Sequence, residues 1–252
     1  MAPTRQFSGR IFAMGGGGFS MEPDNPALDD HLLALTGVDR PRVCFVPTAS
    51  GDADGYVERF EEAFPAERAR ASVLRLFARD VDDLRAFLLD QDVVYVGGGN
   101  TASLLAVWRA HGLPEILAEA AARGTVLAGI SAGMNCWFEA SVTDSFGSRL
   151  APLHDGLGFL AGSACPHFDG EVHRAGTLRR LVADGFPAGY AADDGCALLF
   201  EDGRLVDVVA SRPHADGYRV SRDEDGEVVQ EALGARYLGG YSEPPSSRAT
   251  VS

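Results

Sequence analysis

The chain has 252 residues, of which 46% are hydrophobic and 23% are charged, and its formal net charge is −14. Such a chain can bury a substantial core, and its acidity argues against nucleic acid as a partner, since phosphates are bound by clustered Lys and Arg. No apolar run approaches the ~18 residues of a membrane span, and the N-terminal residues lack an apolar signal segment. The four cysteines have no metal-ligand spacing. We therefore expect a cytoplasmic protein that needs no metal or other cofactor and binds no membrane.

The first two thirds of the chain alternate short apolar strands with amphipathic helices. Strands are predicted at residues 11–14, 43–46, 72–76, 93–96 and 125–128. Helices are predicted at residues 26–37, 56–64, 81–89, 101–110 and 114–123, and the first turns of another at 134–138. This alternation is typical of a mostly parallel sheet with helices on both faces, that is, of an α/β fold.

After residue 157 the pattern loosens. A strand at 157–161 and a helix at 175–183 are followed by short strands at 197–200, 205–209 and 218–220, with Asp-Gly turns at 202–203 and 225–226. We expect one domain over residues 1–241, with a small antiparallel C-terminal extension. The polar residues 242–252 are predicted to form a disordered tail.

The segment Gly129-Ile130-Ser131-Ala132-Gly133 joins a predicted strand to a predicted helix. A strand, G-x-S-x-G and a helix together form the pattern of a nucleophile elbow, in which small residues permit a sharp turn that exposes the serine hydroxyl. The helix N-terminus also favours negative charge beside that hydroxyl. Ser131 is therefore a candidate nucleophile, and the alternative is a tight strand-helix junction.

Two further glycine-rich loops follow strands. Gly15 to Gly18 matches neither a full dinucleotide fingerprint nor a P-loop, and we expect a tight turn against the sheet. The amides of Gly98 and Gly99, with that of Ala132, could form an oxyanion hole. Asn100 is placed to cap the helix that follows, and we also count it as a substrate-binding candidate.

A serine nucleophile needs a base, and the base needs an orienting acid. His167 differs from the other five histidines because it follows Pro166 at the end of a predicted strand. Asp193 and Asp194 lie between two apolar strands, where a plain turn is the alternative interpretation. The order serine, histidine, aspartate departs from the order of α/β-hydrolases.

These pieces resemble the dipeptidase E and cyanophycinase family of serine peptidases, which has a flavodoxin-like fold related to class I glutamine amidotransferases. The matching segments span residues 10 to 210 and are Gly97-Gly98-Gly99-Asn100-Thr101, Gly129-Ile130-Ser131-Ala132-Gly133, Pro166-His167 and Asp194-Gly195. The resemblance implies a flavodoxin-like three-layer sandwich. It also implies Ser131 as nucleophile, His167 as general base and the acidic residue before Gly195 as the orienting group.

The family pattern has glutamate where this chain has Asp194, so Asp193 remains an alternative acid. Members similar to dipeptidase E cleave dipeptides with N-terminal aspartate, and cyanophycinases release β-aspartyl-arginine dipeptides. The resemblance thus implies a small peptide as substrate. Arg174 resembles a family arginine and could bind a substrate carboxylate, and an exposed helical arginine is the alternative.

Other functions are compatible with the same residues. A catalytically silent family member could bind an acidic metabolite or partner at the same site, and an esterase could use the same elbow. The sequence leaves the oligomeric state open between a monomer and a homodimer.

Overall fold

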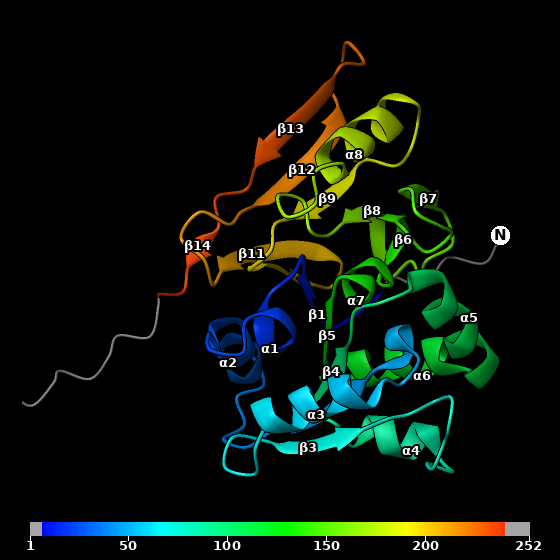
Figure 1. The fold of residues 1–252 in the computed structure, drawn as a ribbon, viewed down its shortest axis with the longest axis vertical. Coiled ribbons are helices and arrows are strands. Elements are labelled where there is room, and N and C mark those ends of the chain that lie inside the picture. Colours follow the sequence, from blue (N-terminus) through cyan, green and yellow to red (C-terminus); the bar gives the residue numbers. More distant parts are fainter. Residues whose placement is uncertain (1–6, 240–252) are drawn as a thin grey trace, which may run out of the picture.

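The computed structural model describes residues 7–239, in which two β-sheets lie side by side (Figure 1). The larger sheet has the order β14-β11-β10-β1-β5-β4-β2-β3. Its strands are β1 (Arg10–Met14), β2 (Arg42–Val46), β3 (Arg70–Val73), β4 (Val93–Val96), β5 (Val126–Ile130), β10 (Cys196–Glu201), β11 (Arg204–Ala210) and β14 (Arg236–Tyr237). Strands β1 to β5 pair in parallel, whereas β10 is antiparallel to both β1 and β11.

Helices cover both faces of this sheet, which confirms the predicted α/β fold class. The helices that precede the second sheet, together with one 3-10 turn, are α1 (Gly18–Met21), α2 (Ala27–Ala34), η1 (Thr48–Ser50), α3 (Asp54–Ala63), α4 (Leu84–Leu89), α5 (Thr101–His111), α6 (Leu113–Ala122) and α7 (Ala132–Asn135). Phe12 and Met14 of β1 pack with residues of α1, α2 and α3, whereas Ile11 and Ala13 pack with residues of α4, α5 and α6. Successive side chains of a strand point to opposite faces, so strands buried on both faces are apolar throughout.

The second sheet has the order β13-β12-β9-β8-β6-β7. Its strands are β6 (Phe138–Thr143), β7 (Ala151–Leu153), β8 (Leu160–Cys165), β9 (Gly189–Ala192), β12 (Gly217–Arg222) and β13 (Val228–Ala232). Helix α8 (Arg174–Ala183) packs on one face through Leu178 and Val182. The other face joins the main core (Figure 1). The extension predicted at the C-terminus is therefore larger than expected, begins at residue 138, and contains the parallel pairs β6–β8 and β8–β9.

The prediction of a helix over residues 134–138 was wrong beyond its first residues. Helix α7 ends at Asn135, and Phe138 begins β6. The aromatic side chains decide this: Trp137 stacks on Phe159, and Phe138 packs edge-on against Phe200 of the main sheet. Because Val and Thr also favour strands, the segment continues as a strand once α7 has turned the chain.

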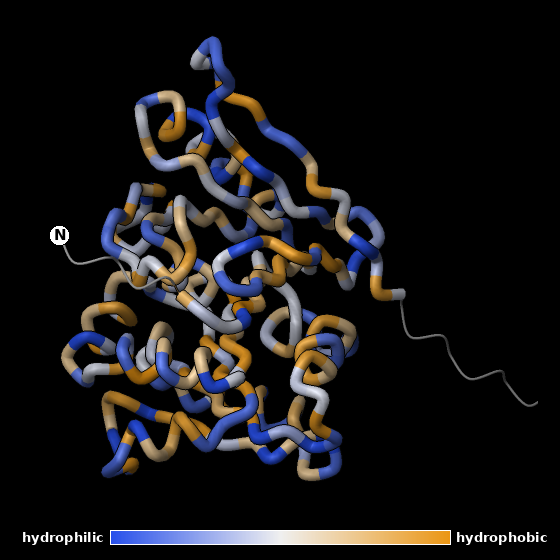
Figure 2. The backbone as a smooth tube through the Cα atoms, turned by 180° about the vertical axis from the view of Figure 1, so that it is seen from behind, coloured by the Kyte–Doolittle hydropathy of each residue, from blue (hydrophilic) through white to orange (hydrophobic). Residues whose placement is uncertain are grey.

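Hydropathy follows these layers. Figure 2 shows hydrophobic segments concentrated at the centre of the molecule, whereas the tip of the β12–β13 hairpin is hydrophilic. None of the helices in residues 7–239 has the length and apolarity that crossing a bilayer would require. The predicted tail at 242–252 lies outside the described residues, and the cytoplasmic location stays a prediction.

Candidate active site

The carboxyl ends of β1, β4 and β5 meet the carboxyl ends of β8 and β9 between the two sheets, beside α7 (Figure 1). Ligands of open α/β sheets bind at this end of the strands. The loop after β1 forms the junction: Gly15 O accepts a hydrogen bond from His167 N at 3.3 Å, and Gly16 O accepts one from Gly195 N at 3.0 Å. Segments that are far apart in sequence are thus held within one small region.

The turn at Ser131 has strained backbone geometry. Its φ is 57° and its ψ is −110°, outside the regions that residues with a Cβ favour. A Cβ at Gly129 would lie 2.3 Å from Gly133 O, and one at Gly133 would lie 2.4 Å from Val96 O. Both flanking glycines are therefore required by close backbone contacts. They hold a half-buried serine at the start of α7.

His167 and Asp194 form a close pair. Nδ1 of His167 lies 2.6 Å from Oδ1 of Asp194, and the two side chains are only 14% and 12% exposed. The hydrogen bond with His167 holds the pKa of the Asp194 carboxyl below its usual value, although burial opposes this. Asp169 holds the backbone of Asp194 in place, because its Oδ1 accepts a hydrogen bond from Asp194 N at 2.8 Å.

Asp193 has different partners. Its Oδ2 accepts hydrogen bonds from Asp216 N at 3.0 Å and from the Tyr218 hydroxyl at 3.1 Å. Burial raises the pKa of Asp193 to about 6. The acid in contact with the imidazole is therefore Asp194, and Asp193 instead ties β9 to the start of β12.

The three amides proposed for the oxyanion hole are not equivalent. Gly98 N donates to the Tyr56 hydroxyl at 3.1 Å, so this amide is already occupied, contrary to expectation. Within residues 7–239, Gly99 N and Ala132 N have no hydrogen-bond acceptor. Gly99 has a φ of 136°, and a Cβ there would lie 2.2 Å from Ala49 O, so only glycine fits. Tyr56 was missed from sequence because it lies in α3, far from the glycine loop along the chain.

Asn100 and Arg174, the two substrate-binding candidates, both make hydrogen bonds within the protein. Asn100 caps α5 through Ser103 N at 2.8 Å, as predicted, and its Nδ2 donates to Ser145 O at 3.0 Å. Arg174 is buried rather than exposed. Its guanidinium binds the Glu171 carboxylate, with Nε to Oε2 at 2.8 Å, and also donates to Val142 O at 3.0 Å. These contacts occupy the guanidinium N–H groups that we expected to bind a substrate carboxylate.

The glycine run after β1 contributes more to the site than the predicted tight turn. A Cβ on Gly16 would lie 2.0 Å from Asp194 Oδ1 and 3.1 Å from His167 Nδ1. A Cβ on Gly15 would lie 2.3 Å from Ala192 O. The run lacks side chains because the histidine-aspartate pair packs directly against its backbone. The four cysteines are all free and buried.

Comparison with known proteins adds independent information. The model of peptidase family S51 matches residues 11–208. The "Uncharacterized peptidase YgaJ" of Bacillus subtilis (strain 168) is 50% identical over 231 residues, which cover 91% of this chain and 99% of that relative. "Peptidase E" of Streptomyces coelicolor is 31% identical over 174 residues, 66% of this chain and 70% of that relative.

A solved structure with a similar fold is that of a peptidase from an acI-B1 actinobacterium. The TM-score is 0.67 at 18% identity, with 91% of this chain and 96% of that chain covered. At this level of identity the likeness concerns the fold. It agrees with the layered α/β architecture described above.

Proposed function

Since the chain belongs to peptidase family S51, we propose that this peptidase cleaves short peptides through an acyl-enzyme on Ser131. In this proposal His167 is the general base and Asp194 orients its imidazole. The observation that carries it is the 2.6 Å contact between His167 Nδ1 and Asp194 Oδ1. The end of β1 links this pair to the strained turn, because Ser131 N donates to Met14 O and His167 N donates to Gly15 O, the next residue. With Nδ1–H donated to the carboxylate, Nε2 is left as the proton acceptor.

The proposed reaction has two steps. Ser131 Oγ attacks the peptide carbonyl carbon while His167 takes the hydroxyl proton, and the tetrahedral intermediate collapses as that proton passes to the leaving amine. Water then attacks the ester carbonyl, His167 takes a proton from the water, and the proton returns to Oγ as the acid product leaves. No redox partner or metal enters this balance.

We assign the stabilisation of the oxyanion to the amides of Gly99 and Ala132. Ala132 lies at the first position of α7, and both amides are free in the described part of the chain. Each such donor typically contributes ~10²–10³ in turnover. Gly98 instead positions the loop through its hydrogen bond with Tyr56.

The proposed substrates are dipeptides with N-terminal aspartate, and β-aspartyl peptides are the second candidate. The support is the family resemblance and the similarity to a Streptomyces protein named "Peptidase E". Because Arg174 is bound to Glu171, it is not included as the group that selects the aspartyl side chain.

The decisive test of the proposed nucleophile is Ser131→Ala. We expect kcat to fall by at least ~10³ on a panel of Asp-X, β-Asp-X and neutral dipeptides, because the covalent step is lost. The far-ultraviolet circular dichroism spectrum should be unchanged, because alanine keeps the Cβ of serine and removes only the hydroxyl group. A fluorophosphonate probe should label the wild type and not the variant. Labelling of neither protein would instead support a catalytically silent binding protein.

A further inference from the structure

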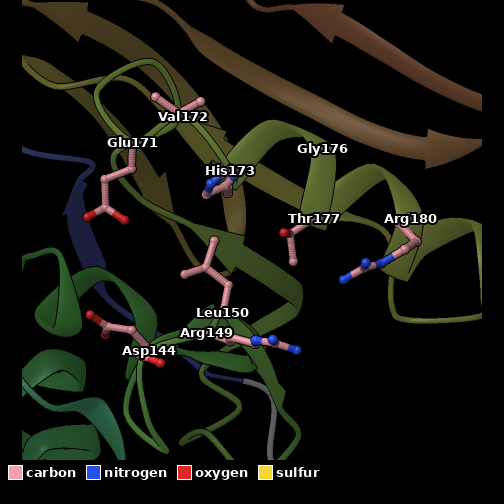
Figure 3. Close-up of a pocket in the computed structure, with 10 residues that line it drawn as sticks. Asp144, Arg149, Leu150, Glu171, Val172, His173, Gly176, Thr177 and Arg180 are labelled. Atoms are coloured by element: carbon pink, nitrogen blue, oxygen red, sulfur yellow. The ribbon is translucent and has the colours of Figure 1, made fainter.

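A cavity of about 760 Å³ lies between the segment that follows β6, residues 144–150, and the segment 171–180, which includes most of α8 (Figure 3). Its charged lining residues are Asp144 and Arg149 on the first side and Glu171 and Arg180 on the second. None of them belongs to the catalytic set proposed above.

Each of the two segments that line the cavity is hydrogen-bonded to a loop of the candidate active site. On one side, Ser145 O accepts the hydrogen bond from Asn100 Nδ2, directly after the Gly98–Gly99 loop. On the other side, Glu171 N donates to His167 O at 3.1 Å. A peptide that leaves the site between these two loops would therefore enter this cavity.

Charges of opposite sign lie at different ends of the cavity. Figure 3 shows the carboxylates of Asp144 and Glu171 toward one end, and the guanidinium groups of Arg149 and Arg180 pointing into the space at the other. Glu171 is neutralised by Arg174. Arg180 lies four residues after Gly176, the first α8 residue of the lining, which is about 6 Å along a helix.

In the described part of the chain, Arg149 and Arg180 have no partner of opposite charge. Among residues 7–239, neither guanidinium makes an ion pair or a hydrogen bond to a protein acceptor, unlike Arg42, Arg85 and Arg109. In a chain of net charge −14, two free guanidinium groups that line one cavity create a local site for an anion. A carboxylate matches the guanidinium fork in both charge and shape.

We propose that Arg149 and Arg180 form a subsite for a carboxylate on the leaving-group side of a short peptide. This assignment rests on the proposed function, because it takes Ser131 as the point of cleavage. An extended residue spans about 3.3–3.6 Å, so the lined length of α8 corresponds to about two residues. The carboxylate is supplied by the C-terminus of a tripeptide or by an acidic side chain after the scissile bond.

The experiment compares three peptides: Asp-Ala-Ala, its C-terminal amide, and Asp-Glu-Ala amide. The first offers a terminal carboxylate, the second offers none beyond the first residue, and the third offers only a side-chain carboxylate. We expect wild-type kcat/KM to be about tenfold higher for a peptide with a carboxylate than for the plain amide, mainly through KM. The peptide that shows the preference identifies the source of the carboxylate.

The variant Arg149→Gln/Arg180→Gln should lose this preference and cleave the three peptides at similar kcat/KM. Arg179→Gln is the matched control, because Arg179 lies next to Arg180 on α8 but donates to Gln230 on β13. It should keep the wild-type preference. Equal kcat/KM for all three peptides in the wild type, or an unchanged preference in the double variant, would overturn the subsite.

These outcomes are separate from failure of the proposed function. Cleavage of aspartyl dipeptides with no preference among the longer peptides removes the subsite and leaves the peptidase mechanism. If neither the dipeptide panel nor the three longer peptides are cleaved, the proposed function fails and the subsite fails with it.

Discussion

At the scale of single residues, the backbone brings the short side chain of Asp194 into contact with the His167 imidazole. Asp194 forms an isolated bridge with Gly16, and Gly195 N donates to Gly16 O. These contacts place the short carboxylate within 2.6 Å of the His167 ring. The position of the main chain therefore allows a side chain as short as aspartate to contact this imidazole.

Asp194→Asn tests the role of this acid. The amide keeps the shape but cannot stabilise a protonated imidazole, so we expect kcat to fall by about 10³–10⁴. Asp193→Asn is the control, since Asp193 contacts Asp216 and Tyr218 rather than the imidazole, and its kcat should stay within about threefold of the wild type. A larger loss of kcat in Asp193→Asn than in Asp194→Asn would reverse the assignment of the acid.

At the scale of elements, the loop after β1 joins the two sheets and leaves no room for a side chain. It receives hydrogen bonds from the His167 loop and from the turn between β9 and β10. The elbow after β5 is packed as closely, with Gly133 against Val96 O. Close backbone packing between loops therefore sets the geometry of the site.

Gly16→Ala should disturb this packing. The added Cβ would lie 2.0 Å from Asp194 Oδ1, so the loop or the acid must move, and we expect kcat/KM to fall by about 10² or more. Gly55→Ala is the matched control, because Gly55 lies in α3 with nothing within 4 Å of an added Cβ. It should raise stability by up to about 1 kcal/mol and leave activity unchanged. Wild-type kcat/KM in Gly16→Ala would show that the loop tolerates a side chain.

At the scale of the whole molecule, one carboxyl is buried where α2 meets the main sheet. Asp29 is 1% exposed, and the Tyr95 hydroxyl lies 3.3 Å from its Oδ1. Burial raises the pKa of Asp29 to about 7 in the folded protein, from an ordinary value of 3.8. Between these two values the folded state binds more protons than the unfolded state. The contribution of Asp29 to stability is therefore lost as the pH rises through this range.

Asp29→Asn removes this dependence. Relative to the wild type, the variant should gain about 1.4 kcal/mol of unfolding free energy per pH unit from pH 5 to 7, with no further gain above about pH 8. Denaturant titrations at pH 5, 6, 7 and 8 measure this difference. Asp24→Asn, which removes an exposed carboxylate, controls for the loss of one negative charge. A difference between Asp29→Asn and wild type that is constant with pH would contradict the expectation.

Much of the fold was predictable because its signals are local. Residues 93–96 form a buried strand and are apolar on both faces, and Asn100 caps α5 as its side chain suggested. The prediction failed after Asn135, where Trp137 and Phe138 find aromatic partners far away in sequence. A helical pattern cannot report such partners, because tertiary packing overrides local preference.

The amino-acid sequence by itself determined the α/β architecture, the position of Ser131 on a strand-helix turn and the placing of His167 and Asp194 at strand ends. Only the tertiary structure decided which aspartate contacts the imidazole, which amides are free and where Arg174 is bound. The physical reason is that strand and turn signals depend on neighbouring residues. Hydrogen bonds such as those of Asp194, Gly98 and Arg174 depend on which segments the two sheets bring together.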